Sequence, residues 1–152
     1  MRIIRSSSTA DYSRANPLII GPDSESEQWL STVAKDAGAP YSVLEKLRRG
    51  DRDVVISVKN LADFNGRTPI LVDDIISSGR TMIEAVRIIL ARSTTVPVCI
   101  AVHGLFADNS DALLAKAGAC VVTSNSIIHE TNAIDVDALL VSAVGEFTQM
   151  PS

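Results

Sequence analysis

Short apolar runs alternate along this chain with longer stretches in which apolar side chains recur at helical spacing. The short runs are typical of buried strands, and the longer stretches are typical of amphipathic helices. The expected strands are residues 17–21, 41–44, 54–58, 69–72, 96–102 and 119–123, with a short candidate at 134–136. One expected helix is capped by Ser24, with Glu27 completing a capping box, and is ended by Gly38; the others are residues 81–90, 110–117 and 137–147.

This alternation predicts the fold class. Strand and helix in turn, with several strands apolar throughout, indicate an α/β fold with βαβ crossovers, a mostly parallel sheet and helices on both faces. The strand at 69–72 is fully apolar and is expected to be central. Residues 1–15 are expected to form a polar arm, residues 16–152 one domain, and residues 45–53 a charged segment without an apolar period. Ligands of such sheets bind beyond the carboxyl ends of the strands.

Composition and charge narrow the classes of partner. The chain has 152 residues, of which 46% are hydrophobic and only 4% aromatic, so we expect an aliphatic core. Lys and Arg number 14 and Asp and Glu 18, and the net charge of −4 argues against nucleic-acid binding. No apolar run approaches the roughly 20 residues of a membrane span, and residues 1–15 do not resemble a secretion signal. We therefore expect a cytoplasmic protein without a membrane partner.

Two cysteines, Cys99 and Cys120, lie inside apolar runs. Alone they cannot form a zinc site. We expect buried thiols of a reducing compartment and no disulfide between them.

The strongest chemical signal is a strand that leads into a small polar turn and a helix, over residues 70–81. Backbone N–H groups, hydroxyls and the positive end of a helix dipole meet in such a turn, and together they suit a phosphate. No Lys follows the glycine, so the turn is not a Walker loop, and its glycine spacing does not fit a dinucleotide loop. The residues of the turn are Ser77, Ser78, Gly79, Arg80 and Thr81.

Two carboxylates, Asp73 and Asp74, precede this turn. They would repel a phosphate unless they faced another group, and the vicinal hydroxyls of a sugar or a bound Mg²⁺ are natural partners. A phosphorylated ribose offers both a phosphate and a diol. The alternative is a capped helix beside two solvated acids.

The string from Val72 to Thr81 resembles the phosphoribosyl pyrophosphate (PRPP) loop of type I phosphoribosyltransferase folds. Other segments resemble, in the same order, the C-terminal half of the ribose-phosphate diphosphokinase (PRPP synthetase) family. These segments are residues 16–29, 45–48, 103–106 and 131–136. The resemblance covers residues 16 to 144 and implies a phosphoribosyltransferase-like domain.

The resemblance implies a reaction and a set of roles. Enzymes of this family transfer the terminal pyrophosphoryl group of ATP to the C1 hydroxyl of ribose 5-phosphate, giving PRPP and AMP, with Mg²⁺. By position, Asp73 and Asp74 are implied to hold the ribose diol or its Mg²⁺, and Asp23 to serve metal and pyrophosphate. Residues 77–81 are implied to bind the 5-phosphate.

The same resemblance implies that Lys46 and Arg48 form the family's Lys-x-Arg pair, on a mobile loop that closes over the triphosphate. Cations suit that place because phosphoryl transfer depends on positioning and charge neutralisation. Without the resemblance these cations would belong to a solvated charged loop.

The chain departs from the family in three ways. Arg80 stands where many synthetases have a second glycine, and residues 24–26 replace other glycines. The family enzyme has two similar domains, and the resemblance covers only the second. The first is implied to supply the adenine pocket, a metal-binding histidine and much of the oligomer contact. We therefore expect a fragment, a truncated product or one part of a split enzyme. It would bind ATP weakly and associate as a homo-oligomer, with an N-terminal half or with a full-length synthetase.

Two other functions stay open. A free-standing phosphoribosyltransferase that uses PRPP would need a hood to hold its base, and no segment here resembles one. A catalytically weak paralogue would bind ribose phosphates or a full-length partner. His103 ends an apolar strand and is either a structural or a functional residue, and His129 is assigned no role.

Overall fold

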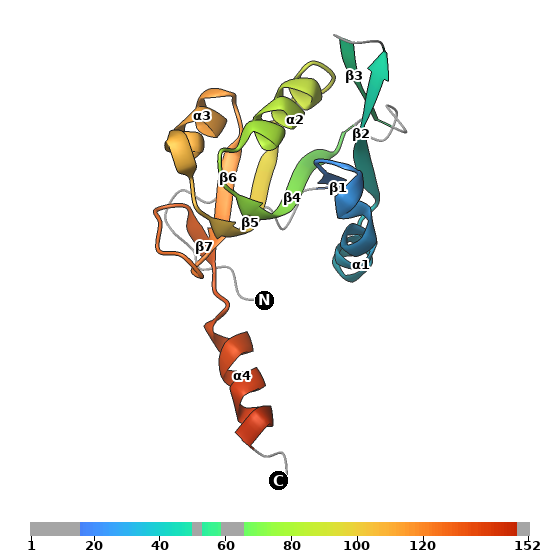
Figure 1. Cartoon of the computed structure of the whole chain (residues 1–152). Helices are drawn as coiled ribbons and strands as arrows, with labels where there is room; N and C mark the ends of the chain where they lie inside the picture. The colour runs from blue at the N-terminus through green and yellow to red at the C-terminus, as the bar shows by residue number, and fades with distance from the viewer. Residues whose placement is uncertain (1–15, 50–52, 59–65, 149–152) are drawn as a thin grey trace.

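A sheet in the order β3-β2-β1-β4-β5-β6-β7 forms the centre of the described part of the molecule (Figure 1). The computed structural model describes residues 16–49, 53–58 and 66–148, with the backbone alone at 45–49 and 53–58. The strands are β1 (Pro17–Gly21), β2 (Tyr41–Arg49), β3 (Asp53–Val58), β4 (Thr68–Ile76), β5 (Val98–Gly104), β6 (Cys120–Ser124) and β7 (Asn132–Ile134). The helices are α1 (Glu27–Ala37), α2 (Arg80–Leu90), α3 (Ser110–Lys116) and α4 (Asp137–Thr148), with 3-10 turns η2 (Ser24–Ser26) and η4 (Ala107–Asn109). The polar arm expected at residues 1–15 lies outside the described residues.

The sheet confirms the predicted fold class. Every neighbouring pair of strands is parallel except β2 and β3, which form an antiparallel hairpin. The apolar strand β4 has three strands on each side, so the prediction of a central strand is also confirmed.

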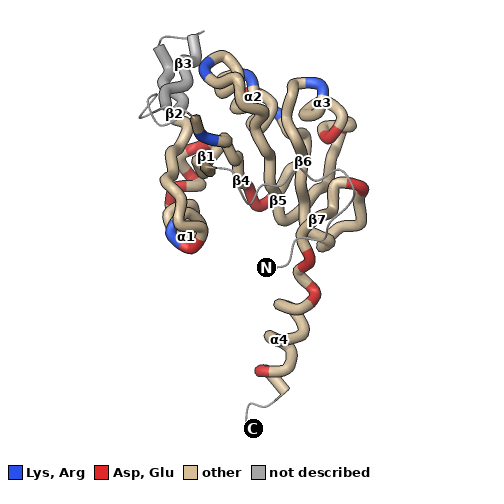
Figure 2. Tube along the Cα trace, turned by 180° about the vertical axis from the view of Figure 1, so that it is seen from behind, with Lys and Arg blue, Asp and Glu red and all other residues tan. Residues whose placement is uncertain are grey.

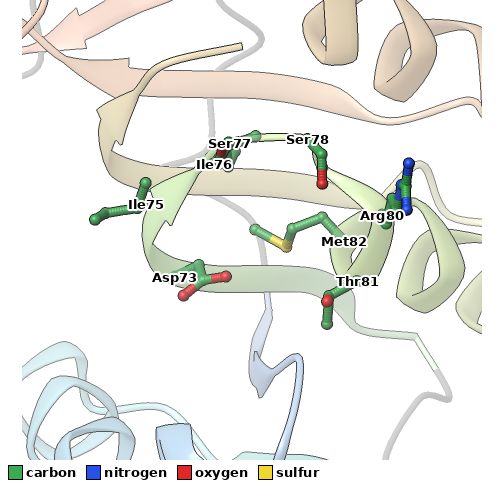
Figure 3. Close-up of a pocket in the computed structure, with 9 residues that line it drawn as sticks. Asp73, Ile75, Ile76, Ser77, Ser78, Arg80, Thr81 and Met82 are labelled. Atoms are coloured by element: carbon green, nitrogen blue, oxygen red, sulfur yellow. The ribbon is translucent and has the colours of Figure 1, made fainter. Parts of the chain in front are cut away.

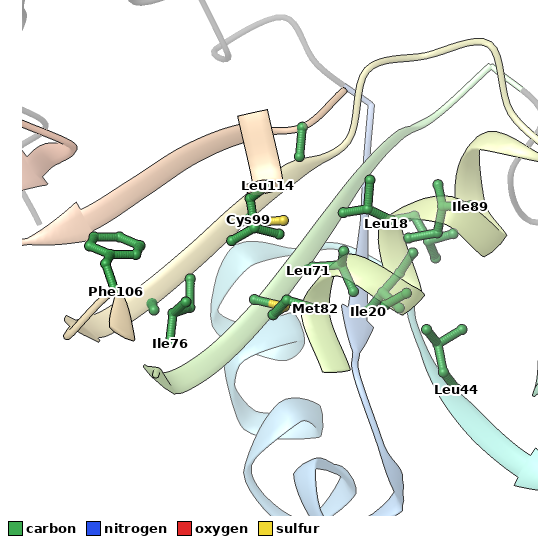
Figure 4. Close-up of a cluster of buried hydrophobic side chains, with 14 residues drawn as sticks. Leu18, Ile20, Leu44, Leu71, Ile76, Met82, Ile89, Cys99, Phe106 and Leu114 are labelled. Atoms are coloured by element: carbon green, nitrogen blue, oxygen red, sulfur yellow. The ribbon is translucent and has the colours of Figure 1, made fainter. Parts of the chain in front are cut away.

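Helices cover both faces of the sheet because successive residues of a strand point to opposite sides. In β1, Leu18 and Ile20 join the larger core cluster with residues of α2 and α3, while Ile19 joins a smaller cluster with Leu30 of α1. Figure 4 shows side chains of the larger cluster, which is aliphatic apart from Phe106, Met82 and Cys99. Helix α1 thus lies on one face, and α2 and α3 lie on the other (Figure 1).

The cysteines fit the expectation of core thiols. Cys99 is fully buried, Cys120 is partly buried, and neither forms a disulfide. Burial raises the pKa of the Cys99 thiol to about 12. Cys99 is paired with Val121 in the parallel register, so Cys120 points to the opposite face and no disulfide forms.

Several local predictions were wrong: the strands expected at 69–72, 96–102 and 134–136 are found at 68–76, 98–104 and 132–134. The helix after β1 was expected to start from a Ser24–Glu27 capping box, but the carboxylate of Asp23 caps η2, and α1 starts at Glu27. Gly38 ends α1 in the left-handed conformation, as predicted. The charged segment at residues 45–53 is largely strand: β2 continues to Arg49, and β3 starts at Asp53.

Helix α4 stands apart from the rest of the fold (Figures 1 and 2). None of its residues is buried, and its apolar side chains Leu139, Leu140, Val141, Val144 and Phe147 are all exposed. Figure 2 shows charge only at a few acidic positions along it. Among the described residues, no helix has the length and apolar character needed to cross a membrane.

Candidate functional site

The site lies where the order of strands reverses. From β1 the chain continues to β2 on one side, whereas β4 lies on the other side of β1 and leads on to β5. The connections after β1 and β4 therefore diverge, into α1 on one face and α2 on the other. Such a switch point opens a crevice at the carboxyl ends of the two strands.

A pocket of about 160 Å³ opens at the end of β4. This volume is well below the roughly 300–1,000 Å³ of pockets for drug-sized ligands, so it suits a small group such as a phosphate. Figure 3 shows Met82 between Asp73 on the strand and Ser78 on the turn. The lining residues are Asp73, Ile75, Ile76, Ser77, Ser78, Gly79, Arg80, Thr81 and Met82.

The turn that joins β4 to α2 has the features of an anion site. Gly79 precedes the first turn of α2 in the left-handed conformation, with φ of 65°, which glycine adopts without strain. Its carbonyl accepts the first helical hydrogen bond from Ile83 N–H at 2.8 Å. The first turn of α2 has no acidic residue, so no carboxylate of that turn competes with a ligand for the positive end of the dipole. Arg80 is exposed beside it.

The two acids before the turn belong to the strand. Because β4 runs on to Ile76, Asp73 and Asp74 are consecutive strand residues and project to opposite sides. Asp73 lines the pocket, and Asp74 is exposed and does not. The structure therefore brings one of the two predicted carboxylates, rather than both, to the phosphate turn.

Asp73 is electrostatically unusual. Its pKa is raised from 3.8 to about 6, mainly by burial and in smaller part by the neighbouring charges of Asp74 and Asp23. The Asp74 N–H, which donates to Asp73 Oδ1 at 2.9 Å, opposes that rise. Asp73 is thus ionised at pH 7 at the expense of desolvation and repulsion, a state that a cation would stabilise.

Asp23 follows β1, the neighbour of β4. Its Oδ1 accepts hydrogen bonds from Glu25 N–H at 3.1 Å and Ser26 N–H at 3.2 Å. It caps η2 and still lies close enough to raise the pKa of Asp73. The described residues contain no group of three or more His, Cys, Asp or Glu side chains arranged to hold a metal ion.

Lys46 and Arg48 lie on the β2–β3 hairpin, paired with Ile56 and Val54 of β3. They are two residues apart in one strand, so they share a face. Only residues 41–43 of β2 pair with β1, which places both cations beyond the carboxyl end of β1, at the same edge as the anion turn. The mobile loop that the resemblance implies for Lys46 and Arg48 stays a prediction, and residues 50–52 lie outside the described part.

Sequence reasoning missed several residues of the site. Ile75, Ile76 and Met82 line the pocket, and only their position beside the turn could have suggested it. Ser110 bonds to the turn from a helix 33 residues away, and no local pattern predicts that contact. His103 contacts the Ser126 hydroxyl through Nδ1 at 2.9 Å and does not line the pocket.

Comparison with known proteins defines the class. The phosphoribosyl transferase domain model matches residues 1–139, so the chain belongs to that family. Ribose-phosphate pyrophosphokinases align with most of the chain. That of Sulfolobus acidocaldarius is 34% identical over 127 residues, covering 80% of this chain and 42% of the relative. That of Sulfurisphaera tokodaii is 36% identical over 124 residues, covering 79% and 42%. The chain therefore spans less than half the length of these relatives.

Solved structures share the fold. PRPP synthetase from Mycobacterium smegmatis superposes with a TM-score of 0.74 at 23% identity, covering 91% of this chain and 47% of that one. Orotate phosphoribosyltransferase from Aeropyrum pernix gives a TM-score of 0.59 at 16% identity, covering 89% and 68%. The predicted phosphoribosyltransferase-like fold and the resemblance to PRPP synthetases are confirmed.

Proposed function

We infer that this chain is the ribose 5-phosphate- and PRPP-binding domain of a ribose-phosphate pyrophosphokinase. The observation that carries the proposal is the junction of β4 and α2, where a phosphate-sized pocket has Asp73 at one side and the start of α2 at the other. A ribose phosphate needs an anion site and a hydroxyl acceptor close together, and residues 73–82 supply both.

Each residue then has a role in the proposed site. The turn from Ser77 to Thr81 binds the 5-phosphate through N–H groups, hydroxyls and the helix dipole. Asp73 accepts hydrogen bonds from the ribose diol or holds its metal. Asp74 lies on the other side of the strand. It acts on the ribose or its metal through its charge, or contacts a ligand that extends around the end of the strand.

Mg²⁺ is the cofactor that this proposal requires, and the donors fit it. Mg²⁺ binds through one or two carboxylates, with substrate phosphates and water as the remaining ligands. Asp23, which follows β1, and Asp73, on the neighbouring strand β4, offer two such carboxylates, and their mutual repulsion would be relieved by a divalent cation. When bound, Mg²⁺ neutralises charge on the pyrophosphoryl group.

The proposed reaction is pyrophosphoryl transfer from ATP. The C1 oxygen of ribose 5-phosphate forms a bond to the β-phosphorus, the bond from that phosphorus to the oxygen of the departing AMP breaks, and the proton of the C1 hydroxyl passes to water. Lys46 and Arg48 are assigned to the triphosphate, whose developing charge they would neutralise. The described pocket is too small for a nucleotide, so ATP is proposed to bind weakly to this chain alone.

Association is part of the proposal. The exposed apolar side chains of α4 support packing against an N-terminal half, a full-length synthetase or a second copy of the chain. Cys99 and Cys120, which form no disulfide, support a reducing compartment such as the cytoplasm.

Calorimetric titration of the purified chain with ribose 5-phosphate, with and without Mg²⁺, tests the proposal, with inorganic phosphate as the reference ligand. Asp73→Asn should weaken ribose 5-phosphate about tenfold, the loss of one charged hydrogen bond, and leave phosphate within about twofold. Asp36→Asn, at an exposed acid of α1, is the matched control. Ribose 5-phosphate that binds wild type no better than phosphate would refute the proposal, and base-dependent consumption of PRPP would replace it with a phosphoribosyltransferase activity.

A further inference from the structure

The anion turn is held from behind by the segment that connects β5 to α3. The carbonyl oxygen of Ile76 accepts hydrogen bonds from the N–H groups of Leu105 at 3.0 Å and Phe106 at 3.1 Å. The next carbonyl, that of Ser77, accepts a hydrogen bond from Ser110 Oγ at 2.6 Å. Two consecutive carbonyls at the start of the turn are therefore bound to one segment, residues 105–110.

These bonds determine where the N–H groups of the turn point. In a planar trans peptide the C=O and N–H bonds point in opposite directions, and the described residues contain no cis peptide. A Ser77 carbonyl directed at Ser110 turns the N–H of Ser78 away from α3. In the same way, an Ile76 carbonyl directed at Leu105 and Phe106 turns the N–H of Ser77 away from those two residues. Both Ser77 and Ser78 line the pocket.

Ser110 is built for contact with this turn. It is completely buried, and a Cβ added at Gly79 would lie 2.9 Å from its Cβ. The absence of a side chain at Gly79 is what lets the turn pack directly on Ser110.

The holding segment is itself in an unusual backbone conformation. The non-glycine residues with positive φ in the described chain are Phe106, Asp108 and Asn109, at 49°, 57° and 56°. Such conformations persist only where surrounding contacts impose them, and they cluster at functional sites. At Phe106 such contacts are present: its ring packs over Gly104 and lies 4.4 Å from the His129 ring, and His129 Nε2 lies 3.6 Å from Asp111.

We propose that Ser110 is a positioning residue of the anion turn: its hydroxyl fixes the Ser77–Ser78 peptide so that the N–H of Ser78 faces the phosphate. This inference rests on the proposed function, because it assumes that the turn binds a phosphate group. It adds a residue of another helix to the site, which itself touches no ligand.

The test compares two buried serines. Ser124 Oγ donates to the carbonyl of Val102 at 2.6 Å and is 2% exposed, so Ser124→Ala removes the same kind of bond at a place away from the turn. Wild type, Ser110→Ala and Ser124→Ala are titrated with inorganic phosphate under conditions where urea melts show each to be folded. The Ser78 amide resonance is followed in the same titration.

Ser110→Ala should weaken phosphate binding about tenfold, the effect of one misdirected hydrogen bond, and reduce the phosphate-induced shift of the Ser78 amide. Ser110→Cys, with a weaker donor, should fall between wild type and Ser110→Ala. Ser124→Ala should bind phosphate within about twofold of wild type, although it loses comparable stability.

The outcomes separate the two claims. If wild type binds neither phosphate nor ribose 5-phosphate, the proposed function fails and the positioning role with it. If wild type binds and Ser110→Ala binds as well as Ser124→Ala, only the positioning role is refuted. Should Ser110→Ala not fold, Ser110→Cys and Ser124→Cys decide by the same criterion.

Discussion

The junction of β4 and α2 differs from helix α4 in how far its side chains find partners within the described residues. At the junction, residues 73–82 supply the pocket, the helix dipole and the carboxylate, and the segment at residues 105–110 holds the turn in place. Along α4, apolar side chains from Leu139 to Phe147 are exposed, and the described residues bury none of them.

This difference shows that a binding site can be complete in a chain whose hydrophobic side chains are not all buried. An anion site needs only a few N–H groups in one strand–helix connection, so one chain can hold it entire. A helix that is apolar on most sides is normally buried, so the side chains of α4 suit a contact that lies outside the described residues. We expect ligand binding at the junction to be independent of α4, and full catalysis to need more than this chain.

The largest expected effect concerns turnover. In the presence of ribose 5-phosphate and Mg²⁺, the chain alone should release AMP from ATP at least about a thousandfold more slowly than a full-length relative. The reason is that the reaction depends on positioning the two substrates, and this chain holds ATP poorly. AMP release is measured for wild type, Lys46→Ala and, as a matched cation control on α1, Lys35→Ala. The prediction fails if the chain turns over as fast as a full-length relative and this turnover is abolished by Lys46→Ala but preserved by Lys35→Ala. The chain would then be sufficient for catalysis.

A substitution at the turn should have the next largest effect. Gly79→Ala puts a Cβ at φ of 65° and 2.9 Å from the Ser110 Cβ. We expect a loss of about 1–3 kcal/mol in the free energy of unfolding and at least about tenfold in phosphate affinity. Gly66→Ala is the control, since Gly66 also has positive φ, 70°, but has open space around it. Equal losses of phosphate affinity in both variants would mean that the packing of the turn on Ser110 does not matter.

The sequence predicted the strand and the turn that form the site, but it did not predict how far β4 extends. The strand at 17–21 was located correctly because breakers flank its apolar run, and the turn at 77–81 because its residues are contiguous. β4 was expected to end at Val72, since aspartates are uncommon in strands. Pairing with β5 carries it to Ile76, which sends Asp73 and Asp74 to opposite sides.

Two of the three other misses share a cause. β2 was expected to end at Leu44 because charges interrupt its apolar pattern, yet pairing with β3 extends it to Arg49. Ser24 and Asp23 are both competent caps, and the backbone, extended at Asp23, decides between them. Ser110 meets Ser77 only after folding. For β2 and for Ser110 the deciding contact lies in another element, so the local pattern carries no information about it.

A smaller effect is expected at Asp73. Its pKa of about 6 in the folded chain exceeds the usual 3.8, so the folded state binds more protons between these values and stability falls as pH rises through them. Asp73→Asn should therefore raise the free energy of unfolding at pH 7 by about 1 kcal/mol, a figure reduced for partial exposure to solvent, and by nothing near pH 3. Urea melts of wild type and Asp73→Asn across this range measure it. A stabilisation that is the same at pH 3 and pH 7 would show that ionisation of Asp73 is not its cause.

The smallest expected effect belongs to α4, and a matched pair of leucines isolates it. Leu139 in α4 is 67% exposed, whereas Leu114 in α3 is completely buried in the main core. Leu114→Ala should cost about 2–5 kcal/mol in the free energy of unfolding, the usual cost of a core cavity. Leu139→Ala should change it by less than about 0.5 kcal/mol, because its side chain gains little from folding of this chain. Urea melts at low protein concentration give both values, and phosphate titration of Leu139→Ala should match wild type. A cost above about 1 kcal/mol for Leu139→Ala under these conditions, where association is suppressed, would mean that α4 packs within the chain itself.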